Sequence, residues 1–265
     1  MAGIAAGASV NNFTNVGLGT DSGLLTAWNF ENAAVGNGPA KSEGTMGGWH
    51  NTPKTQSAET GSDGKFGSIN STDGYYTYQT DLTSTTKDNF SSASFTVSLD
   101  VKDLNANAGC SIFNISRYNS ASVNGQQPII LTLNSAGYIA VTLAGTEVIT
   151  SQTTAADLNW TTLTLTSGLA TADAEYQTLT LYVNGEAVGS AQGWARGGKA
   201  TALQFGAKLG VDNGGKVESM KVDNIAVWNA ALTGAQVASM TVPEPATATL
   251  SLLALAGLCV RRRRR

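Results

Sequence analysis

The chain has 265 residues, of which 42% are hydrophobic, which is enough for a buried core in one β-domain of ordinary size or two small ones. Only 13% of the residues are charged and the formal net charge is −3, so the chain lacks the basic excess of a nucleic-acid-binding protein. Abundant Gly, Ser, Thr, Asn and Ala favour a turn-rich extracellular β-protein over a helical cytosolic one.

The N-terminal segment, residues 1–19, is interpreted as a leader or as the remnant of a signal peptide. Met1 to Ser9 are small and apolar, but they carry no positive charge and are too few for a secretory signal. A chain that begins inside a signal peptide and a chain with a plain leader both fit this pattern.

Strand periodicity runs through the body of the chain, residues 20–241. Phe95 to Val101 alternate apolar and polar side chains, as expected of a half-buried strand. Asn184-Gly185 is the strongest two-residue hairpin signal, between strands expected at 179–183 and 186–190. Further strands are expected at 24–30, 75–78, 110–115, 129–133, 138–143, 162–166 and 203–209. The sequence therefore predicts an all-β fold, a two-sheet antiparallel β-sandwich or jelly roll.

The apolar face of the last expected strand changes parity. Met220 and Val222 share one parity, whereas Ile225 and Val227 share the other. This slip at Asp223-Asn224 predicts a β-bulge or a bend between sheet regions. A Thr-x-x-Gln capping box at 233–236 then predicts one short helix of about two turns at the C-terminal end of the domain.

Residues 242–265 predict a transmembrane tail. Residues 246–260 carry no charge, and as a helix they reach roughly 22 Å, so they cross a hydrocarbon layer of ~30 Å only with snorkelling and local thinning. Arg261 to Arg265 follow, and a Lys/Arg excess stays on the cytoplasmic side, so residues 1–241 lie across the membrane. Without these five arginines, 11 basic residues remain against 19 acidic ones, a net charge of −8.

The alternative for this tail is an amphipathic or core helix followed by a basic segment that binds nucleic acid. Residues 246–260, however, are apolar on all sides of the helix.

The tail also resembles a known sorting signal. The order of a Pro243-Glu244-Pro245 triplet, an apolar stretch and a cluster containing Arg261, Arg262 and Arg263 resembles the PEP-CTERM signal of exosortase-bearing Gram-negative bacteria. This resemblance implies an exosortase as processing partner and removal of the tail. The protein would pass through the inner membrane and then reach the cell surface, outer envelope or extracellular matrix.

Three patches of the body, 25–31, 181–186 and 222–233, resemble the laminin-G-like, concanavalin A-like jelly roll. The resemblance implies a calcium ion at the sheet edge, for which the matching ligands are Glu31, Asp223 and Asn224. Calcium takes six to eight oxygen ligands, so two carboxylates alone do not make a complete site. In the alternative reading Asp223 caps the bulge and Glu31 is a solvated strand end.

Sugar binding would need aromatic rings beside amide or carboxylate groups, because pyranose faces pack on flat rings. The loop and strand-edge candidates are Trp49, Tyr76, Tyr78, Tyr118 and Trp194. Trp28, Trp160 and Trp228 fall in strand patterns and are expected in the core.

No catalytic motif is apparent in the sequence. The closest carboxylate pairs, Asp100 with Asp103 and Asp173 with Glu175, lie at a strand end and in a loop and are expected to be solvated, and the Glu-x-Asp-x-Glu pattern of related glucanases does not occur. The single histidine, His50, argues against a zinc site or a His-based triad. We therefore expect no enzyme activity.

Three functions remain, in the order in which the sequence favours them. The first is a non-catalytic exported module that binds glycans or matrix, and the second is a structural envelope or matrix component without a ligand site. A glycoside hydrolase comes last.

Overall fold

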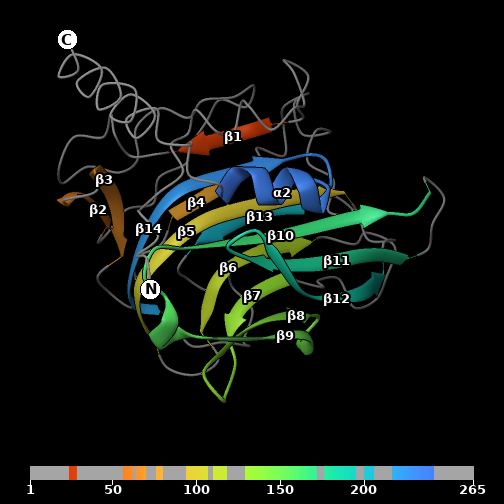
Figure 1. The fold of residues 1–265 in the computed structure, drawn as a ribbon, viewed down its shortest axis with the longest axis horizontal. Coiled ribbons are helices and arrows are strands. Elements are labelled where there is room, and N and C mark those ends of the chain that lie inside the picture. The colour runs from red at the N-terminus through yellow and green to blue at the C-terminus, as the bar shows by residue number, and fades with distance from the viewer. Residues whose placement is uncertain are drawn as a thin grey trace, which may run out of the picture.

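The computed structural model describes residues 24–28, 56–61, 64–69, 76–79, 94–106, 110–117, 129–171, 176–194, 200–205 and 217–241. In these residues two antiparallel sheets pack face to face, with one short α-helix near the C-terminal end (Figure 1). The predicted all-β sandwich is confirmed.

The larger sheet has eight strands, with the order β12-β11-β10-β5-β14-β3-β2 and with β1 paired to β14. Its strands are β1 (Leu24–Trp28), β2 (Gln56–Gly61), β3 (Gly64–Ile69), β5 (Phe95–Ala106), β10 (Thr161–Leu169), β11 (Tyr176–Val183), β12 (Glu186–Trp194) and β14 (Val217–Trp228). One edge of β14 pairs with β5 along most of its length. Its other edge pairs with β3 near Met220 and with β1 near Trp228.

The smaller sheet has six strands in the order β4-β13-β6-β7-β8-β9. They are β4 (Tyr76–Gln79), β6 (Ser111–Arg117), β7 (Ile129–Leu133), β8 (Tyr138–Leu143), β9 (Thr146–Thr154) and β13 (Ala200–Phe205). A single 3₁₀ turn, η3 (Ala155–Asp157), follows β9. The sequence patterns predicted neither this turn nor the strands β2, β3 and β9.

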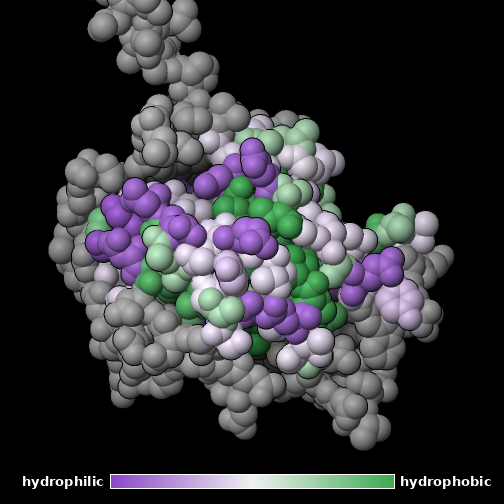
Figure 2. Space-filling view, turned by 60° about the horizontal axis from the view of Figure 1, so that its bottom comes forward, coloured by the Kyte–Doolittle hydropathy of each residue, from purple (hydrophilic) through white to green (hydrophobic). Residues whose placement is uncertain are grey.

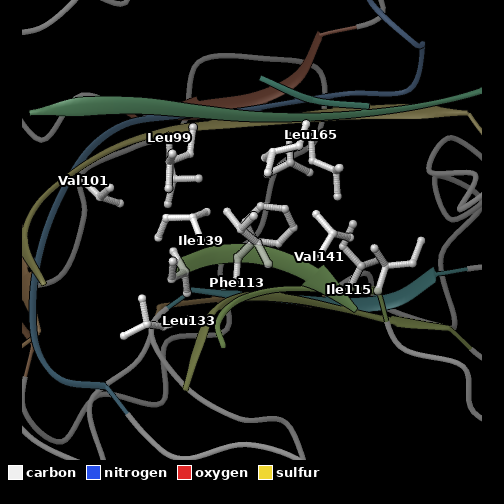
Figure 3. Close-up of a cluster of buried hydrophobic side chains, with 14 of the residues drawn as sticks. Leu99, Val101, Phe113, Ile115, Leu133, Ile139, Val141 and Leu165 are labelled. Atoms are coloured by element: carbon white, nitrogen blue, oxygen red, sulfur yellow. The ribbon is translucent and has the colours of Figure 1, made fainter. Parts of the chain in front are cut away.

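The core lies between the inner faces of the two sheets. Leu99, Val101 and Leu165 point down from the larger sheet towards Phe113 and Ile139 of the smaller one (Figure 3). All five side chains are fully buried. Apolar surface removed from water stabilises the fold by roughly 25 cal/mol per Å², so these alternating side chains hold the sheets together.

A second apolar cluster lies on the outer face of the larger sheet. The helix α2 (Gly234–Thr241) places Val237 and Met240 against Trp228, and Tyr182 and Leu24 join the cluster. Figure 1 shows α2 lying across this sheet beside β1. The helix therefore removes part of the outer face from water, and polar side chains beneath it become buried.

Hydrogen bonds fix the start of α2. The Thr233 backbone N–H donates to Gln236 Oε1 (2.8 Å), and the Gln236 N–H donates to Thr233 Oγ1 (3.3 Å), which confirms the predicted capping box. Upstream, Thr96 Oγ1 donates to the Ala230 carbonyl (2.8 Å) and accepts from the Leu232 N–H (2.9 Å). One threonine of β5 thus ties down the connection between β14 and α2.

The two predicted irregularities of the backbone are also present. Asn184 and Gly185 both have positive φ (49° and 82°), as a two-residue hairpin turn requires, and they join β11 to β12. On β14, Asp223 pairs with Asp100 but Ala226 pairs with Ser98. Two residues of β14 therefore lie opposite one residue of β5, which is the predicted bulge.

No helix in the described ranges combines the length and the apolar character that crossing a membrane requires. The predicted transmembrane tail, residues 242–265, lies outside the described residues.

Glycines on β12 let the two sheets approach along one side of the sandwich. A Cβ atom on Gly189 would lie 2.7 Å from Ile149 Cγ2 of β9, which is closer than carbon atoms pack. Gly189→Ala is therefore expected to lower the free energy of unfolding by about 1–3 kcal/mol in urea titrations. An Ile149→Leu background, whose side chain branches one carbon further out, should reduce the loss.

The matched control is Gly234→Ala, where the new Cβ would meet only Tyr182 atoms at 3.7 Å. Equal losses for the two alanine variants would show that contact with Ile149 is not what requires glycine in β12.

Candidate functional site

Next to the β-bulge, two acidic strand positions, Asp100 and Asp223, lie opposite each other on the outer face of the larger sheet. Asn224 has a positive φ of 47°, and its N–H donates to Asp223 Oδ1 (2.8 Å). Its side-chain Nδ2 donates to Asp100 Oδ2 (2.8 Å) on the neighbouring strand. The bulge therefore turns the Asn224 amide towards the Asp100 carboxylate, whose direct partner on β14 is Asp223.

Asp100 is buried, which corrects the prediction that it is a solvated acid. Only 3% of the residue is exposed, and Asp100 Oδ1 accepts from Thr162 Oγ1 (2.5 Å). Burial raises the pKa of Asp100, while the hydrogen bonds from Asn224 and Thr162 work in the opposite direction. The prediction was wrong because it took the outer face of the strand to be open to water. Asp103, the other member of the predicted pair, is exposed as expected.

One step further along the same strands lies a group of charged and aromatic side chains, which we call the lysine-aromatic patch: Phe66, Lys102, Asp103, Trp160 and Lys221. The Phe66 and Trp160 rings meet edge to face, with centroids 5.6 Å apart. Lys102 Nζ lies 5.7 Å from the Trp160 ring centroid, and Lys221 Nζ lies 5.5 Å from that of Phe66. Lys221 also forms an ion pair with Asp103 at 2.5 Å.

Trp160 was predicted to be a core residue, and the structure corrects this. It lies half-buried in the connection before β10, outside both apolar clusters, with a left-handed φ of 46°. Trp160 stands one residue before the first pair of β10 with β5, so the alternation of the strand does not extend to it. Trp228, in contrast, is fully buried as expected, although it packs under α2 and not between the sheets.

Backbone strain concentrates around this region. Five residues other than glycine have positive φ within the described parts of the chain. Ala144 and Asn184 belong to tight turns, whereas the other three, Asp103, Trp160 and Asn224, lie in or beside the lysine-aromatic patch. Such conformations cost of order 1–3 kcal/mol each and gather at functional sites.

The remaining predicted ligand-binding residues are placed only in part. Tyr76 and Tyr78 lie on β4, the edge strand of the smaller sheet, where they pair with Phe205 and Leu203 of β13. Trp194 ends β12, opposite Tyr176. Their side chains, and the whole of Trp49 and Tyr118, lie outside the described residues.

For the predicted calcium site the structure describes Asp223 and Asn224, while Glu31 lies outside the described residues. In the described part of the chain no three His, Cys, Asp or Glu side chains lie close enough together to hold a metal. Asp100 is a poor additional ligand because both of its oxygens already accept hydrogen bonds. Of the three predicted calcium ligands, the described residues thus include two that are adjacent in the chain, Asp223 and Asn224.

Comparison with family models identifies the body of the chain. Residues 71–238 match the model described as the concanavalin A-like lectin/glucanases superfamily. The chain belongs to this superfamily. Residues 241–265 match the PEP-CTERM protein-sorting motif, which indicates export and processing by an exosortase. A comparison with curated proteins found no match.

Solved structures share the superfamily fold at low sequence identity. Domain 4 of AbnA, a GH43 extracellular arabinanase from Geobacillus stearothermophilus solved with arabinotriose, is 19% identical with a TM-score of 0.56, covering 82% of this chain and 98% of that domain. The receptor-binding domain of botulinum neurotoxin type G is 11% identical with a TM-score of 0.50, covering 83% of this chain and 51% of that one. A Trypanosoma rangeli sialidase is 12% identical with a TM-score of 0.53, covering 83% of this chain and 32% of that one.

The buried carboxyl group predicts a pH-dependent stability. Because its pKa is raised above 3.8 in the folded protein, the native state holds the Asp100 proton more tightly than the unfolded chain. The free energy of unfolding is therefore expected to fall as pH rises from the ordinary pKa through the raised one, and to level off above it. Urea titrations at a series of pH values, with a calcium chelator in the buffer, should show this fall in the free energy of unfolding.

In Asp100→Asn the decrease of the unfolding free energy with pH should be smaller, because the new amide does not ionise. The new amide can still donate to Asn224 if the Asn224 side-chain amide flips and presents its oxygen. The matched control is Asp103→Asn, an exposed acid on the same strand, which should keep the fall. A pH profile unchanged by Asp100→Asn would contradict the prediction.

Proposed function

We propose that the protein is an exported, non-catalytic module that binds glycans at the cell surface. The lysine-aromatic patch carries this proposal. It offers a half-buried indole ring beside ammonium and carboxylate groups, which is the combination that holds a sugar through its C–H face and its hydroxyls. A superfamily that includes lectins, and a similar domain solved with arabinotriose, support the same interpretation.

The surface of the described residues also suits a polar ligand. Only Tyr176 and Val188 are large hydrophobic residues with more than a third of their surface exposed there (53% and 37%). Figure 2 shows one face of the molecule, on which apolar side chains appear between clusters of hydrophilic ones. Large exposed apolar patches mark protein or membrane contacts, and two exposed residues of this kind are few for such a contact in the described part of the chain.

A hydrolase would need two accessible carboxylates about 5–5.5 Å or about 6.5–9.5 Å apart. Asp100 and Asp223 are direct partners across β5 and β14. However, Asp100 is buried and both of its oxygens are engaged, by Thr162 and Asn224. This geometry favours a structural role for Asp100 and supports binding without catalysis.

A glycan array probed with the full chain in detergent tests the proposal. We expect binding to a defined set of saccharides, and a loss of about tenfold in affinity for Trp160→Ala, because the ring removes apolar sugar surface from water. The control is Tyr176→Ala, which removes an aromatic ring that is 53% exposed on β11.

Two other results would replace the proposal. Release of reducing sugar from a bound glycan would indicate a hydrolase. If no saccharide on the array is bound, either with or without calcium, the protein would instead be a structural component of the envelope or matrix.

We propose in addition that calcium stabilises the domain at Asp223 and Asn224, with Glu31 completing the acidic ligands. A ligand that binds only the folded state at 100 times its Kd adds about 2.7 kcal/mol of stability, so millimolar calcium should raise the Tm by about 5 °C. Asp223→Ala should abolish the rise, while Glu186→Gln, an exposed acid on β12, should keep it. A wild-type Tm that does not respond to calcium would remove the ion from the proposal.

A further inference from the structure

The two lysines of the lysine-aromatic patch are placed against each other by the register of the sheet. Lys102 of β5 and Lys221 of β14 are direct antiparallel partners, so their side chains leave the same face. Like charges directly opposite each other destabilise a pair of strands. The register therefore sets two ammonium groups side by side at this point of a protein whose formal net charge is −3.

Three acidic groups, Asp100, Asp103 and Asp223, lie near the two lysines, and within the described residues none of them forms an ion pair with Lys102. Asp103 pairs with Lys221, at 2.5 Å. Asp100, two residues before Lys102 on the same strand, is buried and already accepts hydrogen bonds on both oxygens. Within the described residues Lys102 forms no ion pair, and its contact is the Trp160 ring.

Left-handed backbone conformations position two side chains of the patch. Both Trp160 and Asp103 adopt left-handed φ values, 46° and 49°. The strained Trp160 brings its ring to the Lys102 ammonium and the Phe66 edge, and the strained Asp103 reaches Lys221 alone. Lys102 is thereby left as the cation that an external anion can neutralise.

We infer that the lysine-aromatic patch recognises saccharides that carry a carboxylate, with the sugar against Trp160 and its carboxylate between Lys102 and Lys221. The inference rests on the proposed glycan-binding function and deepens it, because it names the chemical class of the sugar. An ammonium group and a carboxylate form a charge-assisted hydrogen bond, which is about twice as strong as one between neutral groups.

The probe is trigalacturonic acid, and its comparison is the fully methyl-esterified trisaccharide, which keeps the rings but has no charge. Calorimetric titrations with the full chain in detergent should give a Kd for the acid about tenfold lower than for the ester. Raising NaCl from about 20 mM to about 500 mM should weaken binding of the acid and leave the ester unchanged, because salt screens exposed charges.

Variants then locate the contact. Lys102→Met keeps most of the aliphatic stem and should abolish the preference for the acid, whereas Lys102→Arg should keep it. The matched control is Thr178→Glu, which lowers the net charge by the same amount at an exposed position of β11 and should leave the preference unchanged. The Tm of each variant is measured first, and Lys221→Met serves as the second test if Lys102→Met does not fold.

The outcomes separate this inference from the proposed function. Equal affinity for acid and ester, unaffected by Lys102→Met, would overturn the carboxylate specificity and leave glycan binding intact. Displacement of the acid by equimolar acetate would show that the patch holds any carboxylate and would also overturn the inference. Failure to bind any saccharide on the array would overturn both proposals.

Discussion

The pairing of β5 with β14, interrupted by one bulge, is the constraint on which the rest of the structure depends. These strands lie at the centre of the larger sheet, and each contributes side chains to both of its faces. Before the bulge Val222 faces the core, and after it Ile225 and Val227 do. Without the extra residue, the later side chains of β14 would exchange faces, because side chains alternate with a period of two.

The bulge also determines what happens on the outer face. Because β14 regains its register after Asn224, Ala226 and Trp228 face α2 and join the second apolar cluster. Helix α2 covers the sheet from this end, and its capping box and the Thr96 hydrogen bonds keep it there. The Asp100–Asn224 pair lies next along these strands, and the lysine-aromatic patch lies one strand position further out. A buried polar pair thus separates the covered part of the sheet from the half-exposed part.

Local chemistry made much of this fold predictable from the sequence. Alternating side chains identified β5, the Asn184-Gly185 pair identified the hairpin, and the parity slip at Asp223 identified the bulge. The strands β2 and β3 were missed because Gln56–Gly61 and Gly64–Ile69 show little alternation. For β9 the reason is different, since Thr146–Thr154 is a polar edge strand with few apolar side chains to mark it.

The candidate site was harder to predict, because it depends on what covers a sheet and on backbone geometry outside the strands. Asp100 was expected in water, since nothing local to β5 shows that a distant bulge supplies Asn224 as a partner. Trp160 was assigned to the core because it stands next to an apolar run. Its positive φ instead directs the side chain towards Lys102 and Phe66 of the lysine-aromatic patch. The pairing of Lys102 with Lys221 joins residues more than a hundred positions apart, and only the sheet register shows it.

The charge of the whole protein bears on how such a patch would work. With the terminal arginines set aside, 19 acidic residues face 11 basic ones, so the long-range field of the rest of the chain repels anions. At physiological ionic strength that field fades within about 8 Å. A carboxylate therefore gains little from steering and must be held by direct contact, where Lys102, Lys221 and the Trp160 ring lie close together. Selectivity at this site would then depend on the fixed geometry of the patch, which the bulge and the strained residues around it provide.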